Sequence, residues 1–320
     1  MNTNSITFLE VEKEDESIIR EHFPQANIVT KNLNEDELIN ECQNTEILCT
    51  SIYTQITANV VNNLPNLKFI VTRSVGYDHI NLKATQEKNI KVCNVPDYGS
   101  HVIAEHVFAL LLSSIRKISE GDNRVEQEHD FSFRGLKGIA LKGKTLGMIG
   151  TGKIGKNVAR IASLGFLMDV IAYDPFPDLD TARENHFSYS DLETLYSKAD
   201  IISLHCPLNK DTEHLIDKEA INKMKKGVIL INTSRGGVIN TTALIQGLKS
   251  GKISHALLDV LEHEKNIEEN KELTEMPGVI TTPHIAFYAD DSMMKMYEEA
   301  FASINRFVNQ EKLIHQVIGF

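Results

Sequence analysis

The feature that most constrains the fold is a glycine-rich stretch in mid-chain, where Gly150-Thr151-Gly152-Lys153-Ile154-Gly155 fits the pattern G-x-G-x-x-G. The run TLGMIG at 145–150 predicts a buried strand before it, and KIGKNVARIASLGF at 153–166 predicts a helix after it. The first glycine permits a tight turn, the second a close ligand approach, and the third close packing of helix on strand. The stretch therefore predicts a strand–turn–helix unit whose first helical turn offers free N–H groups to phosphates.

The next predicted strand, DVIAYD at 169–174, ends in an acid at the position where a dinucleotide-binding unit needs one. Asp174 lies about 20 residues beyond Gly155, the spacing of a carboxylate that binds ribose hydroxyls. Such a carboxylate repels a 2′-phosphate, and no arginine follows it closely, so NAD is favoured over NADP. The alternative interpretation is an ordinary strand–helix turn with a strand-end aspartate. Strand, glycines, helix and acid together favour NAD binding.

Strands and helices alternate over most of the chain. In the first 97 residues, strands are predicted at 6–11, 46–52, 67–74 and 91–95, with helices at 14–23, 34–43, 57–64 and 82–89. The alternation restarts at 145, with strands at 145–150, 169–174, 201–206, 228–234, 255–260 and 279–284. Such alternation is typical of parallel sheets covered on both faces by helices. The length of 320 residues suggests two such domains.

Three segments fall outside this alternation. HVIAEHVFALLLSSIRKI at 101–118 predicts one long apolar helix, and the polar stretch at 119–138 is expected to be irregular. A last helix, 289–310, has no strand after it and is expected to pack on the first domain. The helix at 101–118 has more apolar surface than one domain needs, so we expect a homodimer interface there. The alternative is a helix buried within one chain.

Composition excludes several classes of protein. The net charge of −11 disfavours a nucleic-acid binder or a binder of anionic membranes. The four cysteines form no CxxC pair and have no histidine cluster beside them, which favours core thiols over disulfides or a metal site. The N-terminus does not resemble a signal peptide, and the longest apolar runs are too short to span a bilayer. We therefore expect a cytoplasmic protein without a metal.

Polar residues follow three later predicted strands. Arg235 comes after VILINTS, Asp259 and Glu264 lie at and beyond the end of HALLDV, and His284 ends VITTPH. In an open α/β sheet, ligands bind at the carboxyl ends of the strands. An arginine grips a carboxylate through two N–H groups, and a histidine transfers a proton at neutral pH. A glutamate beside that histidine orients it and favours its protonated form.

With NAD, this set predicts hydride transfer to or from a 2-oxo or 2-hydroxy acid. Plainer interpretations stay open at this point. A lone arginine is usually a surface charge, the chain has 12 histidines, and Glu264 lies in the charged run LEHEKNIEENKE.

Several motifs in order resemble the D-isomer-specific 2-hydroxyacid dehydrogenases over nearly the whole chain. They are GMIGTGKIG, LHCPLNKDT, MKKGVILINTSRGGVINTTAL, GKISHALLDVLEHE and TPHIAFY. The resemblance implies that Arg235 anchors the substrate carboxylate, His284 is the acid/base and Glu264 is its partner. Besides the three glycines, it implies cofactor contacts from Lys153, Ile154, Asp174, Cys206, Pro207, Thr212, Thr233, Ser234 and Asp259.

The resemblance also implies two doubly wound parallel-sheet domains. A Rossmann NAD domain, 98–289, is expected to be inserted in a flavodoxin-like substrate domain made of 1–97 and 290–320. Glu264 fits this chemistry better than that of formate dehydrogenases, which resemble the pattern but have glutamine there. No regulatory extension follows residue 320, and we therefore do not expect one of the longer phosphoglycerate dehydrogenases.

Within the family, the sequence is most similar to D-lactate dehydrogenases. TRSVGYDHI resembles their substrate loop, which implies that Val75 and Gly76 offer backbone N–H groups to the substrate. NVPDYGSHVIAEHVFALLL resembles their segment with a tyrosine, here Tyr98, ahead of the long helix. Phe287, with Tyr53, is expected to line a small pocket. Gly99 and His101 depart from the subgroup pattern and leave the substrate open.

We therefore expect an NAD-dependent oxidoreductase that interconverts pyruvate and D-lactate. One alternative is a D-2-hydroxyacid dehydrogenase for a bulkier 2-oxo acid. The other is an NADH-sensing, corepressor-like binding protein on the same scaffold.

Overall fold

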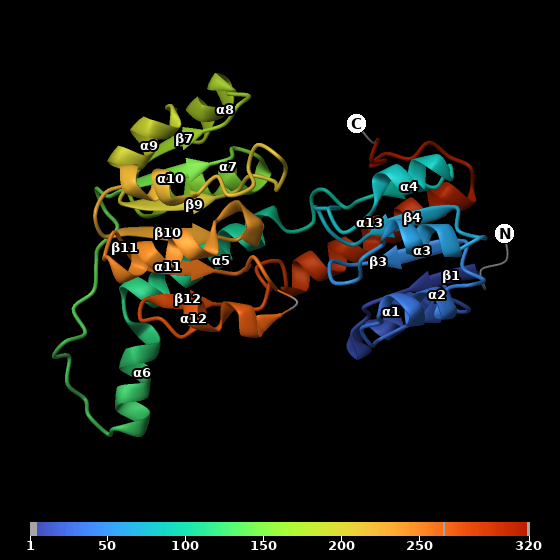
Figure 1. Ribbon diagram of the computed structural model, residues 1–320, viewed down its shortest axis with the longest axis horizontal. Helices are drawn as coiled ribbons and strands as arrows, with labels where there is room; N and C mark the ends of the chain where they lie inside the picture. Colours follow the sequence, from blue (N-terminus) through green and yellow to red (C-terminus); the bar gives the residue numbers. More distant parts are fainter. Residues whose placement is uncertain (1–4, 265, 319–320) are drawn as a thin grey trace. The chain divides into compact units, whose positions relative to one another are not determined.

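The computed structural model describes residues 5–264 and 266–318, and the chain divides into two compact units (Figure 1). Unit 1 comprises Met1–Tyr98 and Asp290–Phe320, and unit 2 comprises Gly99–Ala289. Every strand pair in both units is parallel. The expected fold class, two α/β domains built on parallel sheets, is confirmed.

Unit 1 contains a five-stranded sheet in the order β2-β1-β3-β4-β5. Its strands are β1 (Ile6–Phe8), β2 (Asn27–Ile28), β3 (Ile47–Thr50), β4 (Phe69–Thr72) and β5 (Lys91–Cys93). Its helices are α1 (Glu16–His22), α2 (Glu35–Glu41), α3 (Ala58–Asn63), α4 (Leu82–Glu87) and α13 (Asp290–Val308). The sequence pattern does not predict β2, because a strand of two residues leaves no periodic pattern.

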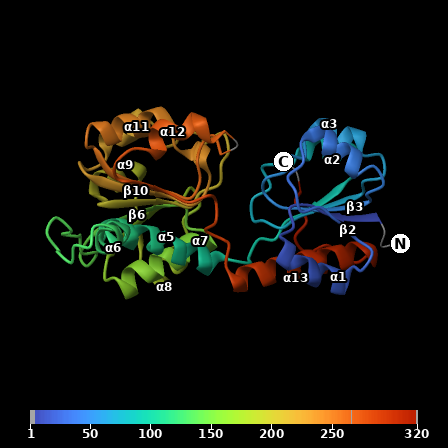
Figure 2. The ribbon, with the colours of Figure 1, turned by 90° about the horizontal axis from the view of Figure 1, so that it is seen from below.

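The two faces of this sheet are covered by different helices. Figure 2 shows α2 and α3 on one face and α1 and α13 on the other. On the first face, Leu38, Val60 and Ile70 belong to one buried apolar cluster. On the second, Phe301 of α13 meets the ring of Phe8 edge-on, with ring centroids 5.9 Å apart. The last helix is thus part of the core of unit 1.

Unit 2 contains a seven-stranded sheet in the order β12-β11-β10-β9-β6-β7-β8. Its strands are β6 (Thr145–Ile149), β7 (Asp169–Tyr173), β8 (Ser188–Tyr189), β9 (Ile201–Leu204), β10 (Val228–Asn232), β11 (Ile253–Leu258) and β12 (Val279–Thr281). The helices are α5 (Ser100–Ile115), α6 (Ile118–Gln127), α7 (Lys153–Arg160), α8 (Leu179–Glu184), α9 (Leu192–Lys198), α10 (Lys218–Lys223), α11 (Thr241–Lys249) and α12 (Lys271–Thr274). Figure 2 shows α5, α7 and α8 on one face and α9 and α11 on the other.

One expectation about α5 was wrong. Its apolar side chains, including Val107, Phe108 and Leu111, are buried within unit 2 rather than left over for a partner. The ring of Phe108 stacks on Phe166, with centroids 5.0 Å apart, and Phe166 directly follows the π-helical turn Ile161–Gly165 that continues α7. The apolar face of α5 is therefore accounted for within one chain, and it does not argue for a homodimer.

The expectation of an irregular segment at 119–138 was partly wrong. α6 begins at Ile118, directly after Lys117 takes a left-handed backbone conformation with φ +53°. Figure 1 shows α6 and the following loop extending away from the layers of unit 2. None of its residues is buried, and Arg124 instead donates to the backbone carbonyls of Ser132 and Arg134 at 3.0 and 2.6 Å. Local contacts of this kind are not visible in an apolar pattern.

All four cysteines are buried and unpaired. In the part of the chain that the structure describes, no helix is both long enough and apolar enough to cross a membrane.

Candidate active site

The predicted catalytic and cofactor residues follow the strands of the sheet in unit 2. Since all seven strands are parallel, their carboxyl ends meet at one edge of the sheet. Gly150 follows β6, Asp174 follows β7 and Cys206 follows β9. Further along the same edge, Thr233, Ser234 and Arg235 follow β10, Asp259 follows β11, and His284 comes shortly after β12. The sheet therefore brings these residues to one edge.

The glycine-rich turn has the geometry that its sequence requires. Gly150 has φ +98°, and a Cβ placed on it would lie 2.6 Å from the backbone of His205. A Cβ on Gly155 would lie 2.4 Å from the carbonyl oxygen of Gly150. Apart from its own chain neighbours and helix backbone, no atom of the described residues lies within 4 Å of the position that a Cβ on Gly152 would occupy. The two outer glycines are thus required by packing, while the middle one leaves open space for a ligand.

The helix after this turn is open to an anion at its first residues. No side chain caps α7, whose first-turn N–H groups have no acceptor within the helix. Across the sheet, the hydroxyl of Thr233 is buried and has no hydrogen-bond partner in the described residues. A buried hydroxyl without a partner is costly unless a ligand completes it. Both observations fit a phosphate-bearing cofactor along this edge.

Asp174 is held in place by three hydrogen bonds. Its Oδ2 accepts from the backbone N–H and the hydroxyl of Thr151, at 2.8 and 2.9 Å. Its Oδ1 accepts from the backbone N–H of Phe176 at 3.0 Å. The carboxylate at the predicted ribose position is therefore oriented by the glycine-rich turn itself.

His284 and Glu264 form a pair, with 3.1 Å between Nδ1 and Oε2. The His284 side chain is 16% exposed and that of Glu264 is 37% exposed. Nε2 of His284 has no hydrogen-bond partner in the described residues, and the ring of Phe287 meets the imidazole edge-on at 6.4 Å. The structure thus orients the histidine through one nitrogen and leaves the other available for proton transfer.

The backbone of His284 is strained, because φ is +56° and only glycine adopts that region without cost. Asp259 imposes this conformation: its carbonyl oxygen accepts from the His284 N–H, and its carboxylate accepts from the N–H groups of Ile285 and Ala286. The side chain of Asp259 is buried. Burial raises the pKa of Asp259, but hydrogen bonds from His106, Thr282 and the backbone outweigh it and lower the pKa below its ordinary value.

Arg235 leaves β10 on an extended backbone, and its half-buried side chain donates to the carbonyl oxygen of Ser234 at 2.8 Å. The next residue, Gly236, lies against the segment that carries the glutamate, since a Cβ there would come within 2.0 Å of the backbone of Leu261. Leu261 in turn donates its N–H to Oε1 of Glu264 at 3.3 Å. A side chain at 236 would push the Arg235 turn and the Glu264 segment apart.

The remaining cofactor candidates on the β9 side form a closed loop. The hydroxyl of Thr212 donates to the carbonyl oxygen of Pro207 at 2.6 Å and accepts from the N–H of Asn209 at 2.8 Å. Cys206 is buried, and burial raises the pKa of its thiol to about 11, so the thiol is protonated at neutral pH. The Ser234 hydroxyl donates a hydrogen bond to Oδ1 of Asn232 at 2.8 Å.

The predicted substrate residues Val75, Gly76 and Tyr98 belong to unit 1. The carbonyl oxygen of Val75 accepts from Asn94 at 2.7 Å, and that of Gly76 accepts from the Ser74 hydroxyl at 2.6 Å. The N–H groups of Val75 and Gly76 have no acceptor among residues 5–264 and 266–318. Both carbonyls are therefore fixed, while both N–H groups are available to an anion. Tyr98 is buried, and Tyr53 is half exposed.

Comparison with known proteins places this geometry in a family. Residues 108–286 match the family model of the NAD-binding domain of D-isomer-specific 2-hydroxyacid dehydrogenases. The chain belongs to this family.

Three relatives illustrate the likeness. The hydroxypyruvate reductase of Thermotoga maritima is 40% identical over 82% of this chain and 84% of its own. An aromatic 2-oxoacid reductase of Clostridium sporogenes is 40% identical over 75% of this chain and 76% of its own. A solved D-lactate dehydrogenase from Aquifex aeolicus, complexed with NAD and lactic acid, aligns with a TM-score of 0.87 and 35% identity over 98% of this chain and 99% of its own. The chain is thus an NAD-dependent oxidoreductase of the D-2-hydroxyacid dehydrogenase family.

The sequence pattern of this dehydrogenase gives no sign of the role of one histidine, which lies behind the edge that carries His284. His106 of α5 lies 3.1 Å from the hydroxyl of Thr282 and 3.5 Å from Oδ1 of Asp259 through its Nε2. Thr282 donates its own proton to Asp259 at 2.6 Å. His106 thus supports the carboxylate that shapes the His284 turn. Its partners lie more than 150 residues away in sequence, and no local pattern joins them.

A second histidine–glutamate pair was also missed. Nε2 of His214 lies 2.5 Å from Oε1 of Glu262, and the other oxygen of Glu262 accepts from the N–H of Thr241 at 3.0 Å. The pair joins the loop after β9 to the segment after β11. Burial raises the pKa of Glu262, but the hydrogen bonds from Thr241 and His214 prevail and lower it below its ordinary value.

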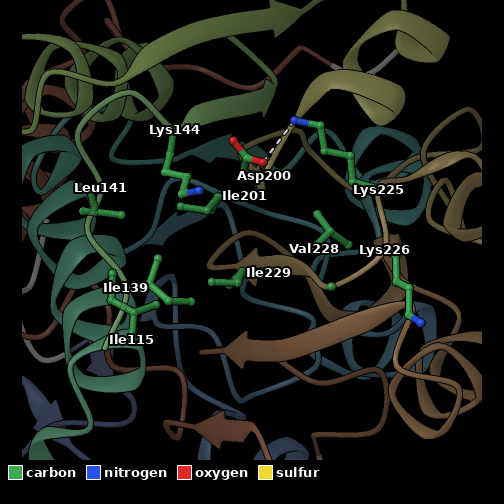
Figure 3. Close-up of a pocket in the computed structure, with 11 residues that line it drawn as sticks. Ile115, Ile139, Leu141, Lys144, Asp200, Ile201, Lys225, Lys226, Val228 and Ile229 are labelled. Atoms are coloured by element: carbon green, nitrogen blue, oxygen red, sulfur yellow. Dashed lines mark hydrogen bonds and ion pairs between the residues drawn. The ribbon is translucent and has the colours of Figure 1, made fainter. Parts of the chain in front are cut away.

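One cavity of about 290 Å³ lies at the opposite edge of the same sheet, beside the residues that precede β6, β9 and β10 (Figure 3). Its floor is apolar, and Lys144, Lys225 and Lys226 stand around it. Lys225 pairs with Asp200 at 3.0 Å, and the other oxygen of Asp200 accepts from the Thr145 N–H at 2.9 Å. Lys225 and Asp200 thus help to hold these strand ends together, at the edge opposite to the one that carries Arg235 and His284.

Proposed function

We propose that this dehydrogenase reduces pyruvate to D-lactate with NADH, and that the reverse reaction uses the same residues. The observation that carries the proposal is the pair His284–Glu264, which leaves Nε2 of His284 available for a proton. The similarity to the D-lactate dehydrogenase of Aquifex aeolicus supports pyruvate as the substrate. We further propose that unit 2 binds NAD and that unit 1 supplies substrate contacts.

The chain's own residues divide the work as follows. Arg235 binds the substrate carboxylate through two N–H groups, and the free N–H groups of Val75 and Gly76 contribute further donors to it. His284, in its protonated form, donates the Nε2 proton to the carbonyl oxygen as that oxygen gains negative charge. Glu264 orients the imidazole through Nδ1 and stabilises its positive charge. NADH, when bound, supplies the hydride that the carbonyl carbon receives.

We propose that the cofactor lies along the carboxyl edge of the unit 2 sheet. The first turn of α7, with Lys153 and Ile154, faces the phosphates, and Asp174 accepts from the ribose. The residues that we propose at the nicotinamide end are Thr233, whose hydroxyl has no hydrogen-bond partner in the described residues, and Asp259. The proposed set of cofactor-binding residues is completed by Cys206, Pro207, Thr212 and Ser234. Phe287, next to the His284 ring, and Tyr98 limit the room for the substrate side chain.

The test is NADH oxidation by the purified chain with pyruvate, hydroxypyruvate, 4-methyl-2-oxopentanoate and phenylpyruvate, followed by chiral analysis of the product. We expect the highest kcat/KM with pyruvate and a product of D configuration. A higher kcat/KM with phenylpyruvate or hydroxypyruvate would assign the enzyme to a bulkier or more polar 2-oxo acid. An absence of turnover with tight NADH binding would instead favour a sensor on this scaffold.

We also propose a homodimer, now on a different observation from the apolar face of α5. In the loop after α6, Phe131 is 95% exposed and Phe133 is 88% exposed. Two aromatic rings this exposed on one extended segment are typical of a contact with a partner. Light scattering should give a dimer for the wild type and a monomer for Phe131→Ser/Phe133→Ser. A wild-type monomer would contradict the proposal.

A further inference from the structure

A chain of three hydrogen bonds runs from the backbone of Asp178 to the carboxylate of Asp174, and a fourth bond reaches that carboxylate separately. The Thr151 hydroxyl lies 2.9 Å from Oδ2 of Asp174 and 3.0 Å from the hydroxyl of Tyr189. The Tyr189 hydroxyl lies 3.1 Å from the backbone N–H of Asp178. The fourth bond is the one from the Thr151 N–H to the same Oδ2, at 2.8 Å.

The direction of every bond in this chain follows from chemistry. An ionised carboxylate only accepts, so the single proton of the Thr151 hydroxyl points to Asp174. The Thr151 oxygen must then accept from Tyr189, and the Tyr189 oxygen accepts from the N–H of Asp178, which can only donate. The proton of each hydroxyl therefore points towards Asp174, and bonds aligned in this way strengthen one another.

The chain also limits what Asp174 can still bind. Oδ2 accepts two hydrogen bonds from Thr151, which fills its two lone pairs. Oδ1 accepts one bond, from Phe176, so one acceptor position stays open. The carboxylate can neither turn nor shift without breaking bonds, and its open acceptor position lies on Oδ1.

Tyr189 is placed for this task by the sheet rather than by its own loop. It pairs with Ala172 in the register of β7 and β8, next to the strand that ends before Asp174. Its ring meets Phe187 edge-on, with centroids 5.3 Å apart and an interplanar angle of 81°. The pairing of β8 with β7 thus sets the position of the Tyr189 hydroxyl behind Thr151.

We propose that Tyr189, acting through the Thr151 hydroxyl, is a positioning residue that sets the preference of this enzyme for NADH over NADPH. A fixed carboxylate at the ribose accepts from a hydroxyl and repels a 2′-phosphate, whereas a carboxylate free to turn away does both less well. The proposal rests on the proposed role of Asp174 at the ribose. Tyr189 itself touches neither the cofactor nor the substrate in this scheme.

The experiment measures kcat/KM for NADH and NADPH, with the 2-oxo acid saturating, in the full-length enzyme. Tyr189→Phe removes one hydroxyl at constant shape and should lower the NADH/NADPH ratio about three- to tenfold, mainly through the KM for NADH. Thr151→Val should lower the ratio at least as much, because it cuts the bond to Asp174 directly. Thr151→Ser keeps the hydroxyl and should restore the ratio to within about twofold of wild type.

Two further variants separate this role from its alternatives. Phe187→Leu disturbs the packing of Tyr189 without touching the chain, so it should lower the melting temperature and leave the ratio within about twofold. If Phe187→Leu lowers the ratio as much as Tyr189→Phe, packing alone explains the effect and the proposal is overturned. Asp174→Ala should lower the ratio most of all.

If Asp174→Ala lowers the ratio while Tyr189→Phe and Thr151→Val do not, the proposal about Tyr189 fails and the role of Asp174 stands. If Asp174→Ala leaves the ratio unchanged, the ribose role of Asp174 fails, and the inference fails with it.

Discussion

Two hydrogen-bonded histidine–glutamate pairs lie at the same edge of the unit 2 sheet. They differ in whether the second imidazole nitrogen of the histidine has a partner. Their glutamates, Glu262 and Glu264, are two residues apart, and both histidines have a left-handed backbone, with φ +51° at His214 and +56° at His284. His284 uses Nδ1 for its glutamate and leaves Nε2 without a partner in the described residues. His214 has a partner at both nitrogens, Glu262 at Nε2 and Asn240 at Nδ1.

The second nitrogen of each histidine decides which pair is able to transfer a proton. Asn240 caps α11 with its Oδ1, which accepts from the Ala243 N–H at 2.9 Å, so its Nδ2 must face His214. Nδ1 of His214 is therefore the acceptor in that 3.4 Å contact, and Nε2 carries the proton that Glu262 binds. A histidine saturated in this way links two loops, whereas a histidine with one open nitrogen can act as an acid.

The largest expected effect tests that distinction at His284. His284→Gln removes the general acid, so kcat for reduction of the 2-oxo acid should fall by about 10²–10⁴-fold. NADH should still bind, because the glycine-rich turn and Asp174 are untouched, and fluorescence titration will measure this. A kcat within tenfold of wild type would remove His284 from the proposed role and would make the two pairs equivalent.

Arg235→Lys tests whether the substrate carboxylate is bound beside the His284–Glu264 pair. We call it the open pair, because Nε2 of its histidine has no partner in the described residues. Lysine keeps the charge but loses the two-pronged geometry of the guanidinium. The KM for the 2-oxo acid should rise about 10- to 100-fold, the share of a hydrogen bond between charged groups, with a smaller fall in kcat. Steady-state kinetics at saturating NADH give both values. A larger loss in kcat than in KM would contradict the role of a binding anchor.

Glu264→Gln sharpens the comparison further, since it keeps the shape of the open pair and removes its charge. Activity at low pH should stay within a few fold of wild type. As pH rises, the rate of reduction should decline earlier than in wild type, by up to about tenfold, because no negative charge stabilises the imidazolium. The measurement is the pH profile of kcat/KM. Superimposed profiles would leave Glu264 in the exposed charge run where the plainer interpretation placed it.

The fold and the His284–Glu264 pair could be predicted from the sequence for identifiable reasons. The strand–turn–helix at Gly150–Gly155 and the polar strand ends at Arg235, Asp259 and His284 are local patterns, and a parallel sheet gathers strand ends without further information. NAD was correctly inferred from that pattern, and the family is confirmed by the match over residues 108–286.

What the sequence could not carry depends on contacts between distant segments. His106 supports Asp259 across more than 150 residues, and Glu262 binds His214 across 48. Within LEHEKNIEENKE, nothing local tells Glu262 from Glu264, because their partners lie on different loops. The prediction about α5 was wrong for the same reason. An apolar helix indicates burial, but the pattern does not indicate which surface covers the helix.

His214→Ala should show the opposite pattern from His284→Gln. It leaves Glu262 half-buried without its partner, so the free energy of unfolding should fall by about 1–3 kcal/mol. Turnover should fall less than tenfold, since no proton passes through this pair. Chemical denaturation and steady-state kinetics on the same preparation provide both numbers. A loss of activity comparable to that of His284→Gln, with unchanged stability, would contradict the assignment of His214 as a link between loops.

The smallest expected effect concerns the pH dependence of stability at the His214–Glu262 pair. We call it the closed pair, because its histidine has a partner at both nitrogens. Because the folded protein lowers the pKa of Glu262, this carboxylate stabilises the fold above the ordinary glutamate value of about 4.3, and the stabilisation is lost as pH falls through the lowered folded value. Glu262→Gln cannot accept from both Thr241 and His214, so it should cost about 1–2 kcal/mol at neutral pH. The difference from wild type should shrink as pH falls through the lowered folded value, because the wild-type carboxyl is then protonated and resembles the amide. Glu264→Gln is the matched control, with a smaller cost, because the Glu264 side chain is 37% exposed and that of Glu262 only 18%. A cost of Glu262→Gln that stays constant from neutral pH to pH 3 would mean that shape, and not charge, holds the closed pair together.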